Sequence, residues 1–138
     1  MDDAKIKGLL ETVFEARKKS YSPYSGYSVG AGLISGSGKI YTGGNIENAS
    51  YPICICAEQT VFSAAISEGE KSFSAIAVVG GKEDAEGRAV SGYCFPCGKC
   101  RQLMAEFCED DFLVITAKNI DDYKVMTLGE LLPEAFRL

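Results

Sequence analysis

Cys56-Ala57-Glu58 and, farther along the chain, Pro96-Cys97-Gly98-Lys99-Cys100 are the two stretches around which the sequence is organised. Each stands at the start of a segment whose apolar residues have helical spacing, so the cysteines are expected at helix N-termini. A helix N-terminus favours negative charge and therefore the ionised form of a cysteine. Together the stretches offer three thiolates and one carboxylate, which we interpret as one metal site with a proton-transferring group beside it.

Zinc is the metal that this set of residues favours. It prefers thiolate and imidazole ligands, and a catalytic zinc uses three protein ligands and keeps the fourth position for water. The chain contains no histidine, so the ligands must be thiolates and a carboxylate must move protons. We predict Cys56, Cys97 and Cys100 as zinc ligands and Glu58 as the proton shuttle. A C-x-x-C pair alone has low specificity, and a redox-active thiol pair remains an alternative.

Length and composition favour a single domain, residues 1–138, with a small uncharged partner. A chain of 138 residues that is 46% hydrophobic suits one core. The longest apolar run, 75–79, is far too short for a membrane span, and a net charge of −5 argues against binding of nucleic acid. With no leader visible we expect a cytoplasmic protein, in which the other cysteines, Cys54, Cys94 and Cys108, are unpaired bystander thiols.

The pattern of apolar residues predicts an α/β fold, a three-layer α/β/α arrangement with a mixed five-stranded sheet. The segment 73–79 is nearly all apolar, which is typical of a strand covered on both faces. Residues 80–93 are rich in glycine and charge and predict a long exposed loop. The predicted helices are 4–19, 56–68, 98–108 and a short one at 128–136 cut by Pro133, and the predicted strands are 27–35, 39–43, 73–79, 112–117 and 123–128.

The sequence resembles the cytidine deaminase family over nearly its whole length. The two metal stretches match, and further motifs occur in the family's order. These are Ser22-Pro23-Tyr24-Ser25 followed by Val29-Gly30-Ala31, then Asn45-Ile46-Glu47-Asn48-Ala49-Ser50-Tyr51-Pro52, and Glu130-Leu131-Leu132-Pro133. Cysteine ligands, a non-ligand glutamate and Pro-Cys-x-x-Cys are the general pattern of zinc deaminases.

The resemblance implies zinc-dependent hydrolytic deamination of cytidine and deoxycytidine to uridine and deoxyuridine, in pyrimidine salvage. It implies a homotetramer whose active sites are shared between subunits. In addition to the predicted ligands and Glu58, it assigns a substrate-binding role to five residues. Asn45 and Glu47 would bind the ribose hydroxyls, Tyr27 would form the floor of the site, the amide of Ala57 would face the pyrimidine, and Phe136 of a neighbouring subunit would stack on the base.

The sequence departs from the family pattern at several places. Gln59 occupies the position at which this family commonly has an arginine bonded to the thiolates, so Lys99 or Arg101 would have to balance their charge. The 40 residues from 57 to 96 that separate Cys56 from Cys97 indicate an insertion within 82–94, expected as a protruding loop.

Two further departures bear on the substrate. Phe95 replaces a small residue, and Tyr27 replaces the usual phenylalanine. The alternatives are a deaminase for another aminopyrimidine nucleoside such as blasticidin S, against which Asn45 and Glu47 argue, and a non-catalytic zinc or redox thiol protein.

Overall fold

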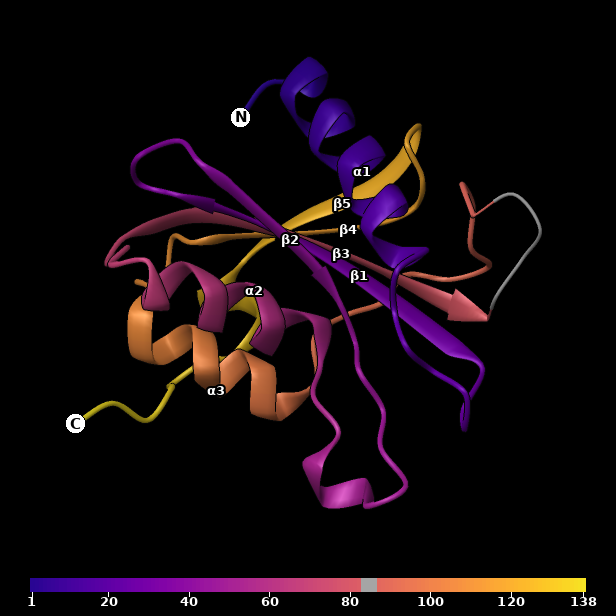
Figure 1. The fold of residues 1–138 in the computed structure, drawn as a ribbon. Helices are drawn as coiled ribbons and strands as arrows, with labels where there is room; N and C mark the ends of the chain where they lie inside the picture. The colour runs from indigo at the N-terminus through magenta and orange to yellow at the C-terminus, as the bar shows by residue number, and fades with distance from the viewer. Residues whose placement is uncertain (83–86) are drawn as a thin grey trace.

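Helices cover both faces of a five-stranded sheet in the computed structural model, which describes residues 1–82 and 87–138 (Figure 1). The three-layer α/β/α architecture is confirmed. None of the helices in these residues has the length and apolar character that a membrane span requires. The elements are α1 (Asp3–Arg17), β1 (Tyr27–Ser35), β2 (Ile40–Gly44), a 3-10 turn (Tyr51–Ile53), α2 (Ala57–Ser67), β3 (Phe73–Lys82), α3 (Gly98–Phe107), β4 (Leu113–Asn119), β5 (Asp122–Thr127) and α4 (Leu128–Leu131).

The sheet is mixed, as predicted, with the strand order β2-β1-β3-β4-β5. β3 and β4 pair in parallel, and the other neighbouring pairs are antiparallel. Antiparallel neighbours need only short connections, whereas a parallel pair needs a crossover, which α3 supplies between β3 and β4. The crossover brings the N-terminus of α3 to the same side of the sheet as α2 (Figure 1).

β3 lies at the centre of the sheet and contributes to both hydrophobic cores. Ile76 and Val78 belong to the core beneath α2 and α3, whereas Ala77 and Val79 belong to the core beneath α1. Because side chains alternate along a strand, a nearly continuous apolar run places apolar groups on both faces. On its side of the sheet, α1 buries a single stripe, formed by Ile6, Leu9, Leu10, Val13 and Phe14.

Hydrogen bonds hold the C-terminal end of α1 against the sheet. The buried guanidinium of Arg17 donates hydrogen bonds to the carbonyls of Ser28 (2.9 Å), Gly81 (2.9 Å) and Lys82 (2.6 Å). α1 approaches β1 so closely that a Cβ on Gly30 would lie 2.5 Å from the carbonyl oxygen of Val13. This contact fixes the position of β1, from which the next segments reach the candidate site.

Two of the predicted boundaries differ from the structure by three residues or more. β3 continues through Lys82, where a loop starting at residue 80 was predicted. The terminal helix ends at Leu131 rather than at residue 136, because Leu132 precedes Pro133 and has an extended φ of −140°.

The predicted insertion within 82–94 is described only in part. Residues 83–86 lie outside the described residues, so the prediction of a protruding loop is tested only at the flanking positions. After them, the chain returns to the sheet, where the amide of Val90 donates to the carbonyl of Lys118 (2.8 Å). Val90 also packs against the core beneath α1.

Candidate metal centre and active site

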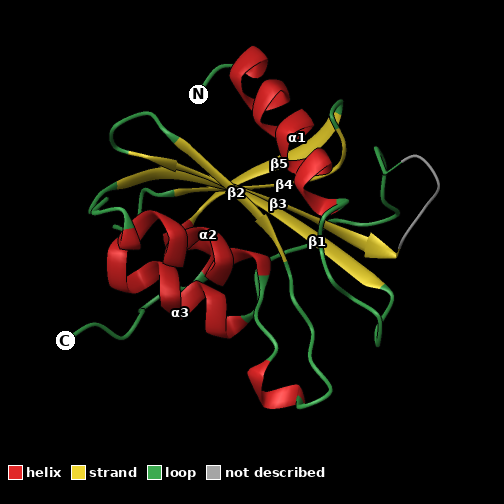
Figure 2. Cartoon of the chain, viewed as in Figure 1, coloured by secondary structure: helices red, strands yellow, loops and turns green. Residues whose placement is uncertain are grey.

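The N-termini of α2 and α3 bring three cysteines together. Cys56 is the residue before α2, Cys97 is the residue before α3, and Cys100 lies in the first turn of α3. Their sulfur atoms all lie within 4.8 Å of one another. The two helices run side by side beneath the sheet, which is why residues about forty positions apart in the sequence form one cluster (Figure 2).

This cluster fits zinc. Three sulfurs bound to one zinc at about 2.3 Å in tetrahedral geometry lie about 3.8 Å apart, so only a small adjustment of the side chains is needed. A hydrogen bond from the Cys100 thiol lowers the pKa of Cys56 to about 6, and the same bond raises the pKa of Cys100. Metal binding would displace the protons of these thiols.

Glu58 lies beside the cluster in the first turn of α2. Its side chain is buried, with 4% of its surface exposed, and burial raises the pKa of its carboxyl group. The raised pKa means that Glu58 holds a proton more readily than a surface glutamate does. A carboxyl group in this position can accept a proton and return it at neutral pH, which is the property required of a general acid and base.

A cavity of about 490 Å³ opens over the cysteine cluster. It is lined by six of the residues that the sequence assigned to the site, namely Asn45, Glu47, Cys56, Ala57, Glu58 and Cys97. A second cavity, of about 420 Å³, lies between α1 and the turn after β4 and contains no cysteine among the described residues that line it. The two cavities are similar in volume, and their chemistry distinguishes them.

Asn45 and Glu47 are held in place by the backbone around them. The Asn45 amide accepts a hydrogen bond from the Val29 amide (2.9 Å) and donates one to the Tyr27 carbonyl (3.0 Å). The Glu47 carboxylate accepts hydrogen bonds from the backbone of Tyr24 (2.9 Å) and from the Ser25 hydroxyl (2.5 Å). The bond from Ser25 lowers the pKa of Glu47, which is therefore ionised at neutral pH.

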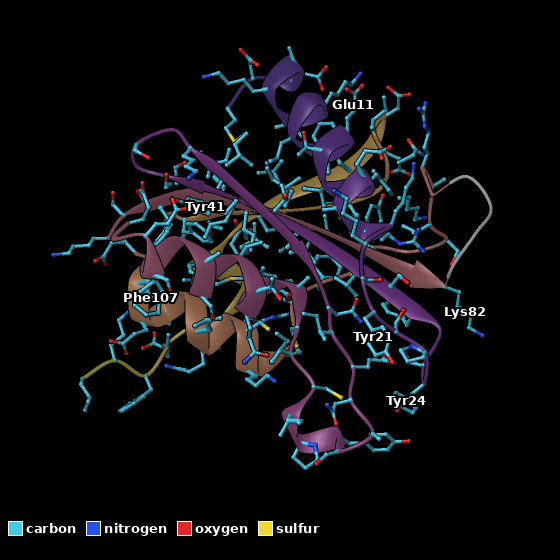
Figure 3. All side chains as sticks on the ribbon, viewed as in Figure 1. Glu11, Tyr21, Tyr24, Tyr41, Lys82 and Phe107 are labelled. Atoms are coloured by element: carbon cyan, nitrogen blue, oxygen red, sulfur yellow. The ribbon has the colours of Figure 1, made fainter. Side chains whose placement is uncertain are left out.

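The segment that carries Asn45 and Glu47 projects beyond the helices and is paired with the segment before β1. The amide of Tyr21 donates to the carbonyl of Asn45 (2.9 Å), and the amide of Glu47 donates to the carbonyl of Tyr21 (2.8 Å). Figure 3 shows Tyr21 and Tyr24 on the side of the molecule where this segment projects. The pairing aligns the two polar side chains along one wall of the cavity.

Two residues assigned by resemblance do not line the cavity of this chain. Tyr27 is 40% exposed, and partial burial and the neighbouring Cys94 thiol raise the pKa of its hydroxyl to about 12. Phe136 is 67% exposed and lies along α3, with its carbonyl accepting from the Gln102 side chain (3.0 Å). The roles that the resemblance assigns to Tyr27 and Phe136 stay predictions.

The other residues that line the cavity include four that lie close to the ligands in the sequence. Cys94, Phe95 and Lys99 come from the stretch around Pro96, and Cys54 comes from the stretch before Cys56. Their closeness to the ligands in the sequence could have predicted this, since residues that flank a ligand at a helix start often line the same cavity. Cys54 and Cys94 were predicted to be bystander thiols, and neither belongs to the three-sulfur cluster.

Gln59 has a structural role at the start of α2. Its side-chain oxygen accepts a hydrogen bond from the amide of Cys56 (2.9 Å), as the third residue of a capping box does. An arginine, which has no acceptor, could not make this bond. Gln59 therefore orients the backbone of a ligand, but it brings no charge to the thiolates.

Replacing Gln59 with leucine is expected to destabilise the zinc-free protein. The amide of Cys56 would lose its acceptor, at a cost of about 1 kcal/mol in the free energy of unfolding. For a chain of this length the melting temperature would fall by about 3 °C. Thermal unfolding followed by circular dichroism measures this shift. Gln59→Glu, which keeps an acceptor at the same place, is the matched control, and equal melting of both variants and the wild type would contradict the capping role.

Comparison with known proteins agrees with this geometry. Residues 3–116 match the model of the cytidine and deoxycytidylate deaminase zinc-binding region. The chain belongs to the cytidine and deoxycytidylate deaminase family. The chain is 41% identical to a cytidine deaminase of Sporosarcina psychrophila, over 95% of this chain and 90% of the relative. It is 43% identical to a cytidine deaminase of Halalkalibacterium halodurans, over 93% and 91%.

Solved structures of the family have the same fold. The crystal structure of a cytidine deaminase from Burkholderia pseudomallei superposes with a TM-score of 0.81 at 42% identity, covering 94% of this chain and 97% of that one. A blasticidin-S deaminase of Bacillus cereus is 31% identical over 90% of this chain and 89% of the relative. The family is thus established, and the blasticidin-S deaminase is less similar than the two cytidine deaminases above.

Proposed function

We propose that this chain, as one catalytic domain, catalyses the zinc-dependent hydrolytic deamination of cytidine and deoxycytidine to uridine and deoxyuridine. One observation carries the proposal. The buried Glu58 and two cysteines of the three-sulfur cluster, Cys56 and Cys97, line the same cavity as Asn45 and Glu47. A metal site and a proton shuttle account for the reaction, and the two polar side chains account for a substrate that carries a sugar.

Cys56, Cys97 and Cys100 would hold the metal. When bound by three thiolates, zinc supplies a Lewis acid that lowers the pKa of water towards neutrality. Cys56 and Cys97 line the cavity, so the cluster faces the space in which the substrate and water would meet. All three ligands are fixed at helix starts, so their positions depend on the rigid packing of α2 and α3 rather than on a loop.

Glu58 would move the protons. Its carboxylate accepts a proton from the attacking water, whose oxygen bonds to C4 of the base. The protonated carboxyl delivers this proton to N3 of the ring, then takes the second proton of the attacking oxygen and delivers it to the amino nitrogen. The bond between C4 and that nitrogen breaks, ammonia leaves, and the oxygen stays on C4 as a carbonyl. The burial that raises the pKa of Glu58 keeps both protonation states accessible during this sequence.

Asn45 and Glu47 would bind the sugar. The Glu47 carboxylate is ionised and held by Tyr24 and Ser25, so it presents its remaining lone pairs without needing to reorganise. The amide of Ala57, at the first position of α2, has no earlier turn of helix to bond to and can donate to the pyrimidine. These contacts favour a nucleoside over a free base.

We further propose that the enzyme is a homotetramer that acts in cytoplasmic pyrimidine salvage, with Phe136 entering the site of a neighbouring subunit. Exposed apolar side chains favour association, because such groups gain free energy when they are buried at an interface. Tyr51 is 70% exposed, Ile53 is 61% exposed, and Phe136 is 67% exposed. The first two flank the cavity or stand next to residues that line it, so association there would cover its open side.

The test is a comparison of substrates. The zinc-loaded protein is mixed with cytidine, deoxycytidine, cytosine or blasticidin S, and the loss of the aminopyrimidine absorbance is followed. Turnover of the two nucleosides supports the proposal, and its abolition by a chelator and recovery with zinc assigns it to the metal. Activity on blasticidin S alone would favour the rival deaminase, and absence of activity on every compound would leave a non-catalytic zinc or thiol protein.

Replacing Glu47 with glutamine is expected to raise the KM for cytidine by about 10- to 100-fold. A hydrogen bond to a charged group contributes roughly 1.5–3 kcal/mol, which corresponds to this range. The zinc content should stay unchanged because Glu47 lies outside the sulfur cluster. Ser25→Ala, which removes one support of the carboxylate and leaves the carboxylate itself, should raise KM less. Equal KM values for wild type and Glu47→Gln would refute the role in sugar binding.

A further inference from the structure

Arg17, at the end of α1, is a buried cation to which the proposed reaction gives no role. Only 3% of its surface is exposed, and its guanidinium donates to three backbone carbonyls. Nη2 donates to Gly81 and Lys82 at the end of β3, whereas Nε donates to Ser28 in β1 (2.9 Å). A buried charge is tolerated only where such bonds compensate it. The bond to Ser28 is the one that leads towards the candidate site.

The carbonyl of Ser28 belongs to the same peptide group as the amide of Val29. That amide donates to the side-chain oxygen Oδ1 of Asn45 (2.9 Å). Because a trans peptide group is planar, its carbonyl and its N–H point in opposite directions. The guanidinium of Arg17, this peptide group and the side chain of Asn45 therefore form one line of hydrogen bonds, which crosses β1 from α1 to the cavity.

The same strand fixes the orientation of the Asn45 side chain. Its Nδ2 donates to the carbonyl of Tyr27 (3.0 Å), and the backbone amide of Asn45 donates to the carbonyl of Val29 (3.2 Å). An asparagine side chain offers two hydrogens on nitrogen and two lone pairs on oxygen. The bonds to Tyr27 and Val29 use one of each. A second hydrogen of Nδ2 is thus available to a sugar hydroxyl in the cavity that Asn45 lines.

The charge of Arg17 strengthens this line of hydrogen bonds. A bond from a charged donor is stronger than one between neutral groups, and successive hydrogen bonds polarise the groups that they share. Electron density drawn from the Ser28 carbonyl makes the Val29 amide a better donor. The bond from Val29 in turn draws density from the Asn45 side chain, so its remaining N–H becomes a better donor to a hydroxyl oxygen.

We propose that Arg17 is a positioning residue for the sugar, which holds and polarises Asn45 through the peptide group between Ser28 and Val29. The inference rests on the proposed function, which assigns Asn45 to the sugar hydroxyls. Arg17 does not line the cavity, so it acts on the substrate only through β1. Its two bonds to β3 also support the fold, and an experiment has to separate the two roles.

The test compares cytidine with 2′,3′-dideoxycytidine, which lacks the sugar hydroxyls at both positions. We expect Arg17→Gln to raise the KM for cytidine about fivefold, as loss of one ordinary hydrogen bond does, with little change in kcat. The inhibition constant of the dideoxynucleoside against cytidine should stay within about twofold of wild type, because the affected contact is absent. Arg88→Gln, the same change at an exposed position outside the cavity, should behave as wild type.

Arg17→Lys is the second variant, because it keeps the charge in the buried site and serves if Arg17→Gln does not fold. The ammonium group lacks the planar fork that serves β1 and β3 together. We therefore expect a smaller rise in the KM for cytidine. Circular dichroism shows whether each variant is folded at the assay temperature, and a purely structural effect would weaken binding of cytidine and of the dideoxynucleoside alike.

A double-mutant cycle with Asn45→Ala provides the second readout. If Arg17 acts through Asn45, its replacement should change the KM for cytidine by less than about twofold once Asn45 is alanine. An unchanged KM in the Arg17 variants that fold, an equal loss for both compounds, or a full effect without Asn45 would overturn the proposal. Failure of the proposed function differs from these outcomes, since the wild type would then be inactive or the single Asn45→Ala variant would bind cytidine normally.

Discussion

Replacing Glu58 with glutamine is expected to lower kcat for cytidine by about 1,000-fold while one zinc per chain is retained. Glutamine fills the same buried space in the first turn of α2, but its amide neither accepts nor returns a proton at neutral pH. Loss of a positioned general acid and base typically costs 10²- to 10⁴-fold in rate. Turnover is measured from the loss of substrate absorbance, and zinc is measured by elemental analysis of the dialysed protein.

Glu106→Gln is the matched control, because it removes an exposed carboxylate from α3 and should leave kcat and zinc content unchanged. Two outcomes would count against the assignment of Glu58. Loss of both zinc and activity would indicate that Glu58 is a metal ligand. Full activity would show that Glu58 is not the proton shuttle.

The thermal stability of Glu58→Gln gives an independent check. Burial is the largest influence on the pKa of Glu58 and raises it, so the ionised side chain is held at a cost in stability. A neutral glutamine avoids the desolvation of a charge, and the melting temperature should stay the same or rise. A variant that is more stable and almost inactive is what is expected when a residue is kept for chemistry rather than for folding.

Local patterns in the sequence were enough to predict the ligand cluster and the architecture. The start and end of β1 were predicted correctly because Tyr27 to Ser35 alternates and is bounded by turn residues. The three cysteines could be placed together because each stands at a helix start, and an α/β fold brings such starts to one edge of the sheet.

Glycines at the end of β3 account for one error of prediction. Gly80 and Gly81 indicated a loop, but both lie within the strand. A Cβ on Gly80 would lie 2.7 Å from the sulfur of Cys94, and one on Gly81 would lie 2.8 Å from Val90. These positions need glycine because the segment with Val90 and Cys94 packs closely against them. A single sequence does not show whether a glycine is there for close packing or for a turn.

The sequence also did not predict the directions in which long side chains point. Gln59, Lys99 and Arg101 all stand within the first turns of α2 or α3, next to ligands. Only the structure distinguishes the backbone cap formed by Gln59 from the carbonyl contacts of Arg101 and from the cavity position of Lys99.

Single replacement of each cysteine by serine is expected to divide the six into two classes. Loss of Cys56, Cys97 or Cys100 should weaken zinc binding on the order of 1,000-fold, because each thiolate contributes a large share of the binding free energy. Activity should be lost with the metal, and the melting temperature should fall, since a ligand that binds the folded state stabilises it. Zinc per chain and thermal unfolding measure both effects.

The other three cysteines are internal controls of the same chemistry. Burial raises the pKa of Cys94 and raises that of Cys108 to about 12, and neither sulfur belongs to the three-sulfur cluster. The Cys54 sulfur accepts a hydrogen bond from the amide of Asn48 (3.2 Å). Serine at any of these positions should leave one zinc per chain. Loss of zinc from Cys94→Ser would show that the cluster extends beyond the three sulfurs.

Cys56→Ser distinguishes the zinc site from a redox thiol pair. A redox pair formed by Cys97 and Cys100 needs only residues of α3 and would not depend on α2. The metal site needs one ligand from α2 and two from α3, because the two helix starts are what bring the sulfurs within 4.8 Å. If Cys56→Ser kept its zinc and its activity, the α3 pair would suffice. If both are lost, the function of the protein depends on the packing of α2 against α3.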